Sequence, residues 1–303
     1  MKRVSDSAIM YFELGNSQQA EGNSIEAIIS YGKSIQLNPT HAVVYNNLGN
    51  SLQQLNQLSQ AEETYLLALD IEADFSEAII NLGNTQRLLG KLIEAEVNYR
   101  KAISINPNLF QAHCNLGATL LDTGRTESAV ESLEKAIELE PNIIQIHNNL
   151  SIALAQLGRY AEAVEVCKTA LALDPVSPIA HNNFGTTLYA MGRLEESEIS
   201  FLEAIRLRPN YAEPYNNLGN IQRKQYKLVD AEKSYTKAIA LNPSFADAYS
   251  NLAIIFNEQE KYLEAEAAFL LALKLKPNYG EAHYNLGNTL KGLNRYDEAI
   301  LQY

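Results

Sequence analysis

Asparagine recurs along this chain at a fixed spacing of 34 residues. The series is Asn47, Asn81, Asn115, Asn149, Asn183, Asn217, Asn251 and Asn285. A primary amide has one acceptor oxygen and two donor hydrogens, so it can pair with both the C=O and the N–H of a main chain. Helix propensity does not explain the series, because Asn competes for backbone hydrogen bonds inside a helix. A regular row of amides could hold an extended peptide with little dependence on its side chains.

A second interpretation assigns these amides to the fold itself. Each Asn could bond the neighbouring helix or turn and thereby fix the angle at which successive elements stack. Further asparagines stand three residues after members of the series, at Asn50, Asn84 and Asn220, and they favour a polar strip that faces outward. The two interpretations are compatible, and both remain open at this point.

Histidine and cysteine are the other residues whose chemistry could matter. His113, His147, His181 and His283 share one place in the 34-residue period. One imidazole per repeat puts them on helices at least about 8–10 Å apart, whereas metal–nitrogen bonds are about 2 Å long. We therefore expect packing at the edge of the core and no metal site. We also expect no cofactor and no catalytic residue, because no phosphate loop or nucleophile motif lies outside the repeat frame.

The composition limits the class of protein. The 303 residues are 46% apolar, which is enough to bury a core and excludes a wholly disordered chain. Acidic residues outnumber basic ones by 36 to 24, giving a net charge of −12 without any Lys/Arg run. Nucleic acid and anionic membranes are therefore poor candidates as partners. The two cysteines are too few for a disulfide framework, so we expect a cytoplasmic protein.

The spacing of the special residues predicts helical hairpins. If the first repeat starts at Ala8, eight repeats occupy residues 8–279, an incomplete ninth occupies 280–303, and residues 1–7 form an N-terminal tail. Positions below are counted within this repeat. Seven of the nine prolines fall at position 32, and Gly or Asn at position 15 suits a helix end in the left-handed conformation. Tyr226 and Glu260 break this rule, so we expect their turns to be built differently or strained.

Each repeat is predicted to contain a helix A and a helix B. Positions 4, 7, 8 and 11 form one apolar stripe of helix A, and helix B shows small, large and small residues at positions 20, 24 and 27, as in Ala95, Tyr99 and Ala102. A Gly at position 8 costs about 1 kcal/mol in helix propensity, so close packing must offset it. No repeat can bury both faces alone, so adjacent repeats must stack. Positions 2, 5, 6, 9, 12 and 13 are then expected to face away from the core.

This pattern resembles the tetratricopeptide repeat (TPR) over residues 8–303. The resemblance implies an all-α, right-handed superhelical solenoid whose A helices line a concave groove. Runs of Asn-Asn-Leu-Gly-Asn, at 46–50 and 216–220, are similar to the superhelical repeats of O-linked N-acetylglucosamine transferases and their bacterial relatives. That likeness implies capture of extended polypeptide by the amide series. Positions 2 and 6 carry no Lys or Arg, unlike the TPR domains that clamp chaperone tails.

The middle repeats differ from the flanking ones. Position 9 is Ile152 and position 12 is Tyr189 where flanking repeats carry polar or basic residues. This difference predicts an apolar floor near repeats four to six that suits a peptide with an apolar anchor. The alternative is sequence drift without a ligand.

We therefore expect a non-catalytic scaffold that binds protein or peptide segments in an Asn-lined groove. One alternative is the substrate-recruiting arm of a longer peptide glycosyltransferase, and another is a self-assembly module. Tyr303 falls in the middle of a predicted B helix. From the sequence we expect the natural chain to continue there, and we expect an open last repeat to favour homo-oligomers.

Overall fold

The computed structural model describes residues 2–303, with side chains from Asp6 onward, and in this range it contains 18 helices and no strand. The helices are α1 (Lys2–Ala20), α2 (Ser24–Leu37), α3 (Ala42–Gln54), α4 (Leu58–Ile71), α5 (Ser76–Leu88), α6 (Leu92–Ile105), α7 (Phe110–Asp122), α8 (Thr126–Leu139), α9 (Ile144–Gln156), α10 (Tyr160–Leu173), α11 (Pro178–Ala190), α12 (Leu194–Leu207), α13 (Ala212–Lys224), α14 (Leu228–Leu241), α15 (Ala246–Glu258), α16 (Tyr262–Leu275), α17 (Gly280–Gly292) and α18 (Tyr296–Ile300). The predicted all-α fold is confirmed. None of the described helices is both long and apolar enough to cross a membrane.

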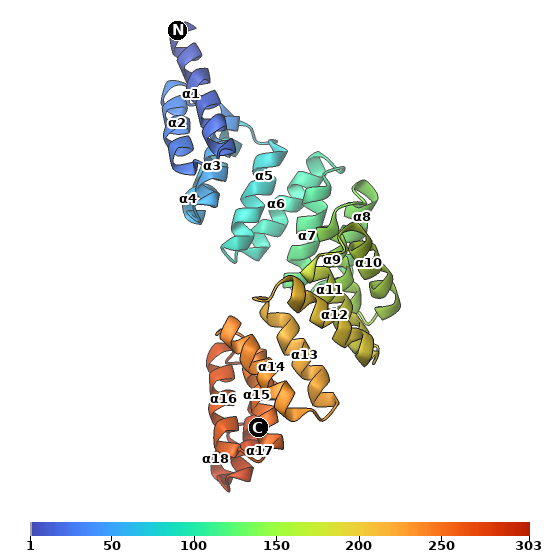
Figure 1. The fold of residues 1–303 in the computed structure, drawn as a ribbon. Coiled ribbons are helices and arrows are strands. Elements are labelled where there is room, and N and C mark those ends of the chain that lie inside the picture. The colour runs from blue at the N-terminus through green and yellow to red at the C-terminus, as the bar shows by residue number, and fades with distance from the viewer. Residues whose placement is uncertain (1) are drawn as a thin grey trace. The chain divides into compact units, whose positions relative to one another are not determined.

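The chain divides into two units, which are described separately. The N-terminal unit, Met1–Leu157, contains α1 to α9, and the C-terminal unit, Gly158–Tyr303, contains α10 to α18 (Figure 1). Inside each unit, an A helix packs against its own B helix, and that B helix packs against the next A helix. Successive A helices also touch, as α5 does with α3 and α7. Each unit is therefore a stack of helical hairpins.

The helix ends follow the 34-residue period. From the second repeat onward, each A helix begins at position 1 and ends at position 13, as the bounds of α5 and α7 show. The B helices from α2 to α16 likewise run from position 17 to position 30. Helix α1 begins earlier, at Lys2, so residues 2–7, predicted as a tail, continue the first helix.

The turn between helices A and B has the same form in the repeats that lie within one unit. In the third repeat, the N–H of Lys91 donates to the carbonyl of Gln86 at 2.8 Å, and the N–H of Gly90 donates to that of Arg87 at 3.0 Å. This is the Schellman pattern, which needs a left-handed residue after the helix. Tyr226 and Glu260 adopt that conformation too, with φ of 60° and 61°. Their turns are therefore built like the others and carry the strain of a side chain there, about 1–2 kcal/mol each.

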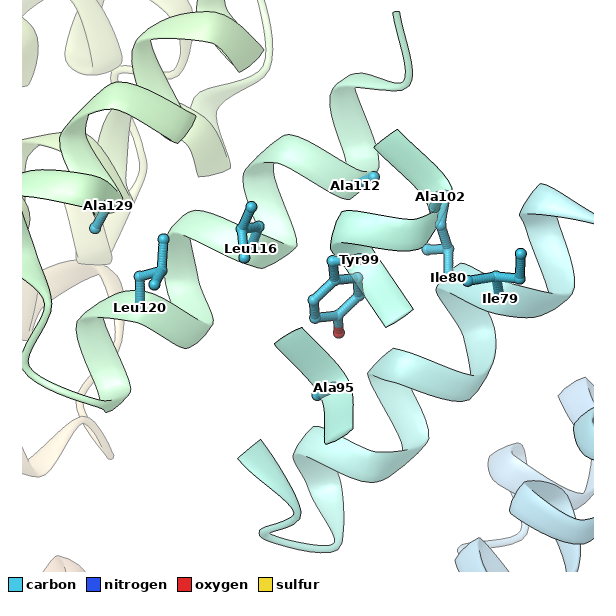
Figure 2. Packing of buried hydrophobic residues seen from close by; sticks show 9 residues of the cluster. All are labelled: Ile79, Ile80, Ala95, Tyr99, Ala102, Ala112, Leu116, Leu120 and Ala129. Carbon is cyan, nitrogen blue, oxygen red and sulfur yellow. The ribbon is translucent and has the colours of Figure 1, made fainter. Parts of the chain in front are cut away.

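The core of most hairpins is an aromatic ring held between small residues, and Leu133 and Cys167 take its place in the fourth and fifth repeats. In the third repeat, Tyr99 on α6 is fully buried, with Ala95 and Ala102 one turn away on either side (Figure 2). The ring faces the glycine at position 8 of helix A. A Cβ added at Gly83 would lie 2.8 Å from Cε1 of Tyr99, and one at Gly49 would lie 2.6 Å from Cε1 of Tyr65. Close packing therefore accounts for the glycine, as predicted.

Position 5 of helix A is buried in most repeats, contrary to the expectation that it faces away from the core. Asn46, Cys114, Asn148 and Asn216 stand at this position and are buried. Successive A helices are in contact, and Nδ2 of Asn46 donates to Oε1 of Glu77 on the next A helix.

The residues at position 4 support the turn that precedes their helix. His113 Nε2 donates to the carbonyl oxygen of Pro107 at 2.9 Å, and the other three histidines of this series bond the matching prolines. The Tyr45 hydroxyl makes the same bond to Pro39 at 3.2 Å. Among the described residues, no group of three or more His, Cys, Asp or Glu side chains could hold a metal ion.

The contact between position 8 and position 24 can be tested by comparing two glycines. Gly49→Ala should destabilise the chain by up to about 2 kcal/mol, because overpacking costs about 1–3 kcal/mol and the gain in helix propensity returns about 1 kcal/mol. Gly32→Ala, inside α2 with no atom near the new Cβ, should instead stabilise it by about 0.5–1 kcal/mol. Urea unfolding measures both changes, and equal effects would contradict the packing explanation.

Candidate functional site

Buried tyrosines on the B helices bond asparagines on the A helices. The hydroxyl at position 24 donates to Oδ1 of the Asn at position 9, at 2.7 Å for Tyr65 and Asn50 and 2.8 Å for Tyr99 and Asn84. Tyr235 makes the same bond to Asn220, and Tyr31 shares its hydrogen between Asn16 at 3.0 Å and Oε1 of Gln19 at 2.8 Å. Each of these bonds gives a buried hydroxyl its partner inside one hairpin. The exposed Tyr303, which follows α18, bonds Asn288 in the same way.

The next repeat donates to the same oxygen. Nδ2 of Asn115, at position 6, donates to Oδ1 of Asn84 at 2.8 Å, so this oxygen receives one hydrogen from its own hairpin and one from the next. We call each such set of three a Tyr–Asn–Asn relay. The three relays are Tyr31–Asn16–Asn47, Tyr65–Asn50–Asn81 and Tyr99–Asn84–Asn115. In these repeats the position-6 amide fixes the stacking, as the second interpretation predicted.

The remaining asparagines of the series use other partners. Asn217 Nδ2 donates to Oδ1 of Asn182 at 3.1 Å, and Asn251 Nδ2 donates to Oδ1 of Asn216 at 2.9 Å. Asn149 accepts a bond from Gln145 of its own helix at 3.0 Å, and its Nδ2 lies 4.0 Å from Sγ of Cys114. Asn183 is buried in α11, and Asn285 is half-buried in α17. Position 6 is thus engaged with a neighbouring A helix in several repeats that lack a relay.

A paired substitution in the sequence signals the relay. Wherever position 24 is Tyr, position 9 is Asn, and wherever position 24 is another residue, position 9 is not Asn. The pairs without Tyr are Leu133 with Ala118, Cys167 with Ile152, Phe201 with Thr186, and Phe269 with Ile254. The reason is physical, because a buried hydroxyl needs a partner and an Asn needs a donor. Our sequence analysis missed this signal, although comparing the repeats with one another would have found it.

The N-terminal unit has a hollow of about 560 Å³ on the exposed side of its A helices. It lies along α5 and α7 and reaches the start of α9. Its apolar lining is Ile80, Leu109, Phe110, Cys114 and Ile143, and its polar lining is Glu77, Asn81, Asn84, Gln111, Asn115 and Gln145. Amides thus border an apolar floor, a combination that can bond a main chain while enclosing a side chain.

The hollow gathers only part of the predicted site. It includes Asn81, Asn84 and Asn115, but its lining does not include Ile152 or Tyr189. Ile152 is 37% exposed on α9, and Tyr189 on α11 lies under the ammonium of Lys224, 4.2 Å from its ring centroid. The apolar hollow therefore begins one repeat earlier than the predicted floor.

The residues that the sequence analysis missed lie where repeats join. Leu109 and Ile143 stand at position 34 and Phe110 at position 1, next to the turn that follows the proline. The sequence signal that could have identified them is the presence of large apolar residues beside a turn.

Glu77 is the one charged residue in the lining of this hollow. Its Oε1 accepts a hydrogen bond of 2.9 Å from Nδ2 of Asn46, an amide that is only 1% exposed. Oδ1 of Asn46 in turn accepts from Asn81 at 3.0 Å. A buried amide from the neighbouring helix therefore positions the carboxylate. Burial raises the pKa of the Cys114 thiol on the floor, which disfavours the nucleophilic thiolate form.

Comparison with family models assigns the repeats. Models described as tetratricopeptide or TPR repeats match residues 8–41, 30–63, 83–124, 114–178, 185–226, 216–280 and 268–301. The chain belongs to the tetratricopeptide repeat family. The TPR fold typically serves as a non-catalytic scaffold for interactions between proteins. A search of curated proteins found no significant match.

Solved TPR structures share the fold. The crystal structure of the APC/C hetero-tetramer Cut9–Hcn1 matches 88% of this chain with a TM-score of 0.71 at 18% identity, and the match spans 52% of that chain. A TPR protein from Parabacteroides merdae matches 83% of this chain and all of its own, with a TM-score of 0.69 and 18% identity. YrrB, described as a TPR protein with an unusual peptide-binding site, matches 61% of this chain and 95% of its own, with a TM-score of 0.51 and 24% identity.

The relay predicts energetic coupling between Tyr99 and Asn84. Tyr99→Phe should cost about 1 kcal/mol, the net value of one hydrogen bond, and Asn84→Thr should cost about 1–3 because it leaves a buried hydroxyl without its partner. The double variant reproduces the Phe and Thr pair of the sixth repeat. We expect its cost to fall below the sum by about 0.5–1.5 kcal/mol. Urea unfolding of the four proteins measures this coupling, and additive costs would show that the bond carries no energy.

The buried phenols predict a loss of stability in alkali. Burial raises the pKa of Tyr31 to about 12 and that of Tyr65, Tyr99 and Tyr235 further, whereas an unfolded Tyr titrates near pH 10. Above pH 10 the unfolded chain releases protons that the folded chain retains, so stability falls as pH rises, by up to about 1.4 kcal/mol per pH unit for each phenol. Urea unfolding between pH 8 and 11 should show this slope. Tyr99→Phe removes one buried phenol and should make the fall of unfolding free energy with pH less steep. An unchanged slope would show that the buried phenols do not cause the loss of stability.

Proposed function

We propose that this TPR chain is a non-catalytic scaffold that holds an extended polypeptide along the A-helix face of its repeats. The observation that carries the proposal is the hollow of the N-terminal unit, where the amides of Asn81, Asn84 and Asn115 border an apolar floor. An extended main chain offers alternating donors and acceptors to such amides, and the floor can receive one of its side chains.

The structural role of the amides leaves capacity for a ligand. Asn115 uses one of its two Nδ2 hydrogens on Asn84. Its second hydrogen and its Oδ1 are the groups that we assign to a bound main chain. An amide already held by a neighbouring helix loses little side-chain freedom when a peptide binds, which favours affinity.

Two further considerations support the proposal. Peptide binding is attributed to the structurally similar TPR protein YrrB, which shares the fold of this chain. Cys114 and Cys167 are both buried and are not joined by a disulfide, which suits a reducing compartment, so we include a cytoplasmic location in the proposal. The hollow favours peptide capture over the self-assembly alternative, because its lining fits a polypeptide segment. A substrate-recruiting arm of a glycosyltransferase would use the same hollow in the same way.

The amide role can be separated from the structural role by two variants of one relay. An array of random peptides probed with the full chain supplies ligands, whose affinities are then measured by fluorescence anisotropy. Asn115→Ala should weaken these ligands by about 5–10-fold, the value of about 1–1.5 kcal/mol for one or two hydrogen bonds. Tyr99→Phe, which loosens the same relay from outside the hollow, should leave affinity unchanged.

The control makes the outcome decisive. Thermal unfolding should show a similar loss of stability for Asn115→Ala and Tyr99→Phe. If both variants bind as the unaltered chain does, the amides serve the fold alone. If the array yields no ligand, the scaffold proposal is wrong.

A further inference from the structure

We propose that the hollow of the N-terminal unit selects polypeptide segments in which an apolar side chain is flanked by Lys or Arg. This inference rests on the proposed function and specifies the chemistry of the ligand at that same site. It follows from four features: the apolar floor, the single carboxylate at its edge, the pairing of the nearby cation, and the charge of the unit.

The floor defines the anchor. The floor comes from α5 and α7 and from the residues that precede α7 and α9, so it encloses a side chain from several directions. Its residues are Ile80, Leu109, Phe110, Cys114 and Ile143. Full burial of a Leu or Phe side chain strengthens binding by at least ~10-fold. The apolar anchor should therefore supply most of the affinity at this site.

The edge of the hollow defines the charge of the flanking residue. Glu77 is exposed, and among the described residues it forms no ion pair with any Lys or Arg. The lining contains no cation, so nothing there would hold an acidic or phosphorylated side chain. Because the buried amide of Asn46 fixes one carboxylate oxygen, the other is available to a ligand cation without much loss of side-chain freedom.

The cation nearest in sequence does not compete for Glu77. Arg87, further along α5, has its Nε 2.9 Å from Oδ2 of Asp122 on α7. The two charges cancel locally and leave Glu77 as the uncompensated charge at this part of the groove. A Lys or Arg of the ligand can therefore pair with Glu77.

The charge of the whole unit acts in the same direction. Residues 1–157 contain 18 acidic and 9 basic residues, a net charge of −9, whereas residues 158–303 contain 18 acidic and 15 basic residues, a net charge of −3. The field of the N-terminal unit attracts basic segments and raises their association rate, an effect that salt weakens.

Four fluorescein-labelled twelve-residue peptides test the inference by anisotropy on the full chain. They share a Ser/Ala background and differ in the central triplet, which is Lys-Leu-Lys, Ser-Leu-Ser, Lys-Ser-Lys or Glu-Leu-Glu. We expect Lys-Leu-Lys to bind at least ~10-fold more tightly than Lys-Ser-Lys and about 3–5-fold more tightly than Ser-Leu-Ser. Glu-Leu-Glu should bind more weakly than Ser-Leu-Ser, and the differences due to charge should shrink as salt is raised.

Two pairs of variants assign these preferences to the hollow. Glu77→Gln keeps an oxygen acceptor for Asn46 and should abolish most of the preference for Lys-Leu-Lys over Ser-Leu-Ser. Glu63→Gln, an equal charge change at an exposed site on α4, should preserve it. Cys114→Phe should fill the hollow and remove the preference for Leu over Ser, whereas Cys114→Ala leaves the hollow open and should retain it. Phe12 occupies the same repeat position, so the repeat already accommodates Phe there.

The possible results separate this inference from the scaffold proposal. If peptides from the random array bind and respond to Asn115→Ala, but the four designed peptides bind equally, the scaffold stands and the selectivity is refuted. The selectivity is likewise refuted if Glu77→Gln leaves the charge preference intact or if none of the four designed peptides binds. Circular dichroism checks that each variant is folded, and Gln111→Leu provides a second change to the lining if Cys114→Phe does not fold.

Discussion

In most hairpins a ring at position 24 is packed against a glycine at position 8, and this contact sets the separation of the two helices. In the third repeat, Tyr99 reaches Gly83 so closely that not even a methyl group fits between them. The hydroxyl on the same ring donates to Oδ1 of Asn84 on helix A, and that oxygen also accepts a hydrogen bond from Asn115 of the next repeat. One side chain therefore fixes the hairpin through its ring and helps to fix the stacking of hairpins through its oxygen.

The sequence predicted the fold almost completely because the same signals for helices and turns recur in each repeat. The period fixed the helix ends, the prolines and glycines marked the turns, and the residues at positions 20, 24 and 27 are buried where Ala95, Tyr99 and Ala102 represent them. The burial of position 5 was not predictable from the stripe of one helix, because contacts between neighbouring A helices decide it. Residues such as Asn46 look exposed on a single helix and become buried only in the stack.

The candidate site was predicted in part for a related reason. Spacing identified Asn81 and Asn115 as a row on one face, and the structure places both in the lining of the hollow. The hollow itself depends on the distance between Phe110 and Ile143, which lie in successive repeats. The spacing of residues in the sequence does not determine that distance. The amides also stabilise the fold, because Nδ2 of Asn81 and Nδ2 of Asn115 each donate to an asparagine of the preceding A helix. These hydrogens are therefore already used before a ligand binds.

The fourth repeat has Leu133 and Ala118 where its predecessors have Tyr and Asn, so no relay joins α7 to α9. Asn149 bonds its own helix there and only approaches the Cys114 sulfur. The directed side-chain bond at this joint runs instead from Oγ1 of Thr126 on α8 to Oε1 of Gln156 on α9, at 3.2 Å. The hollow, with Ile143 on one side, thus extends across the joint at which the series of relays ends. A peptide held there would bridge two hairpins that no shared asparagine oxygen connects, and would add polar contacts of its own to that joint.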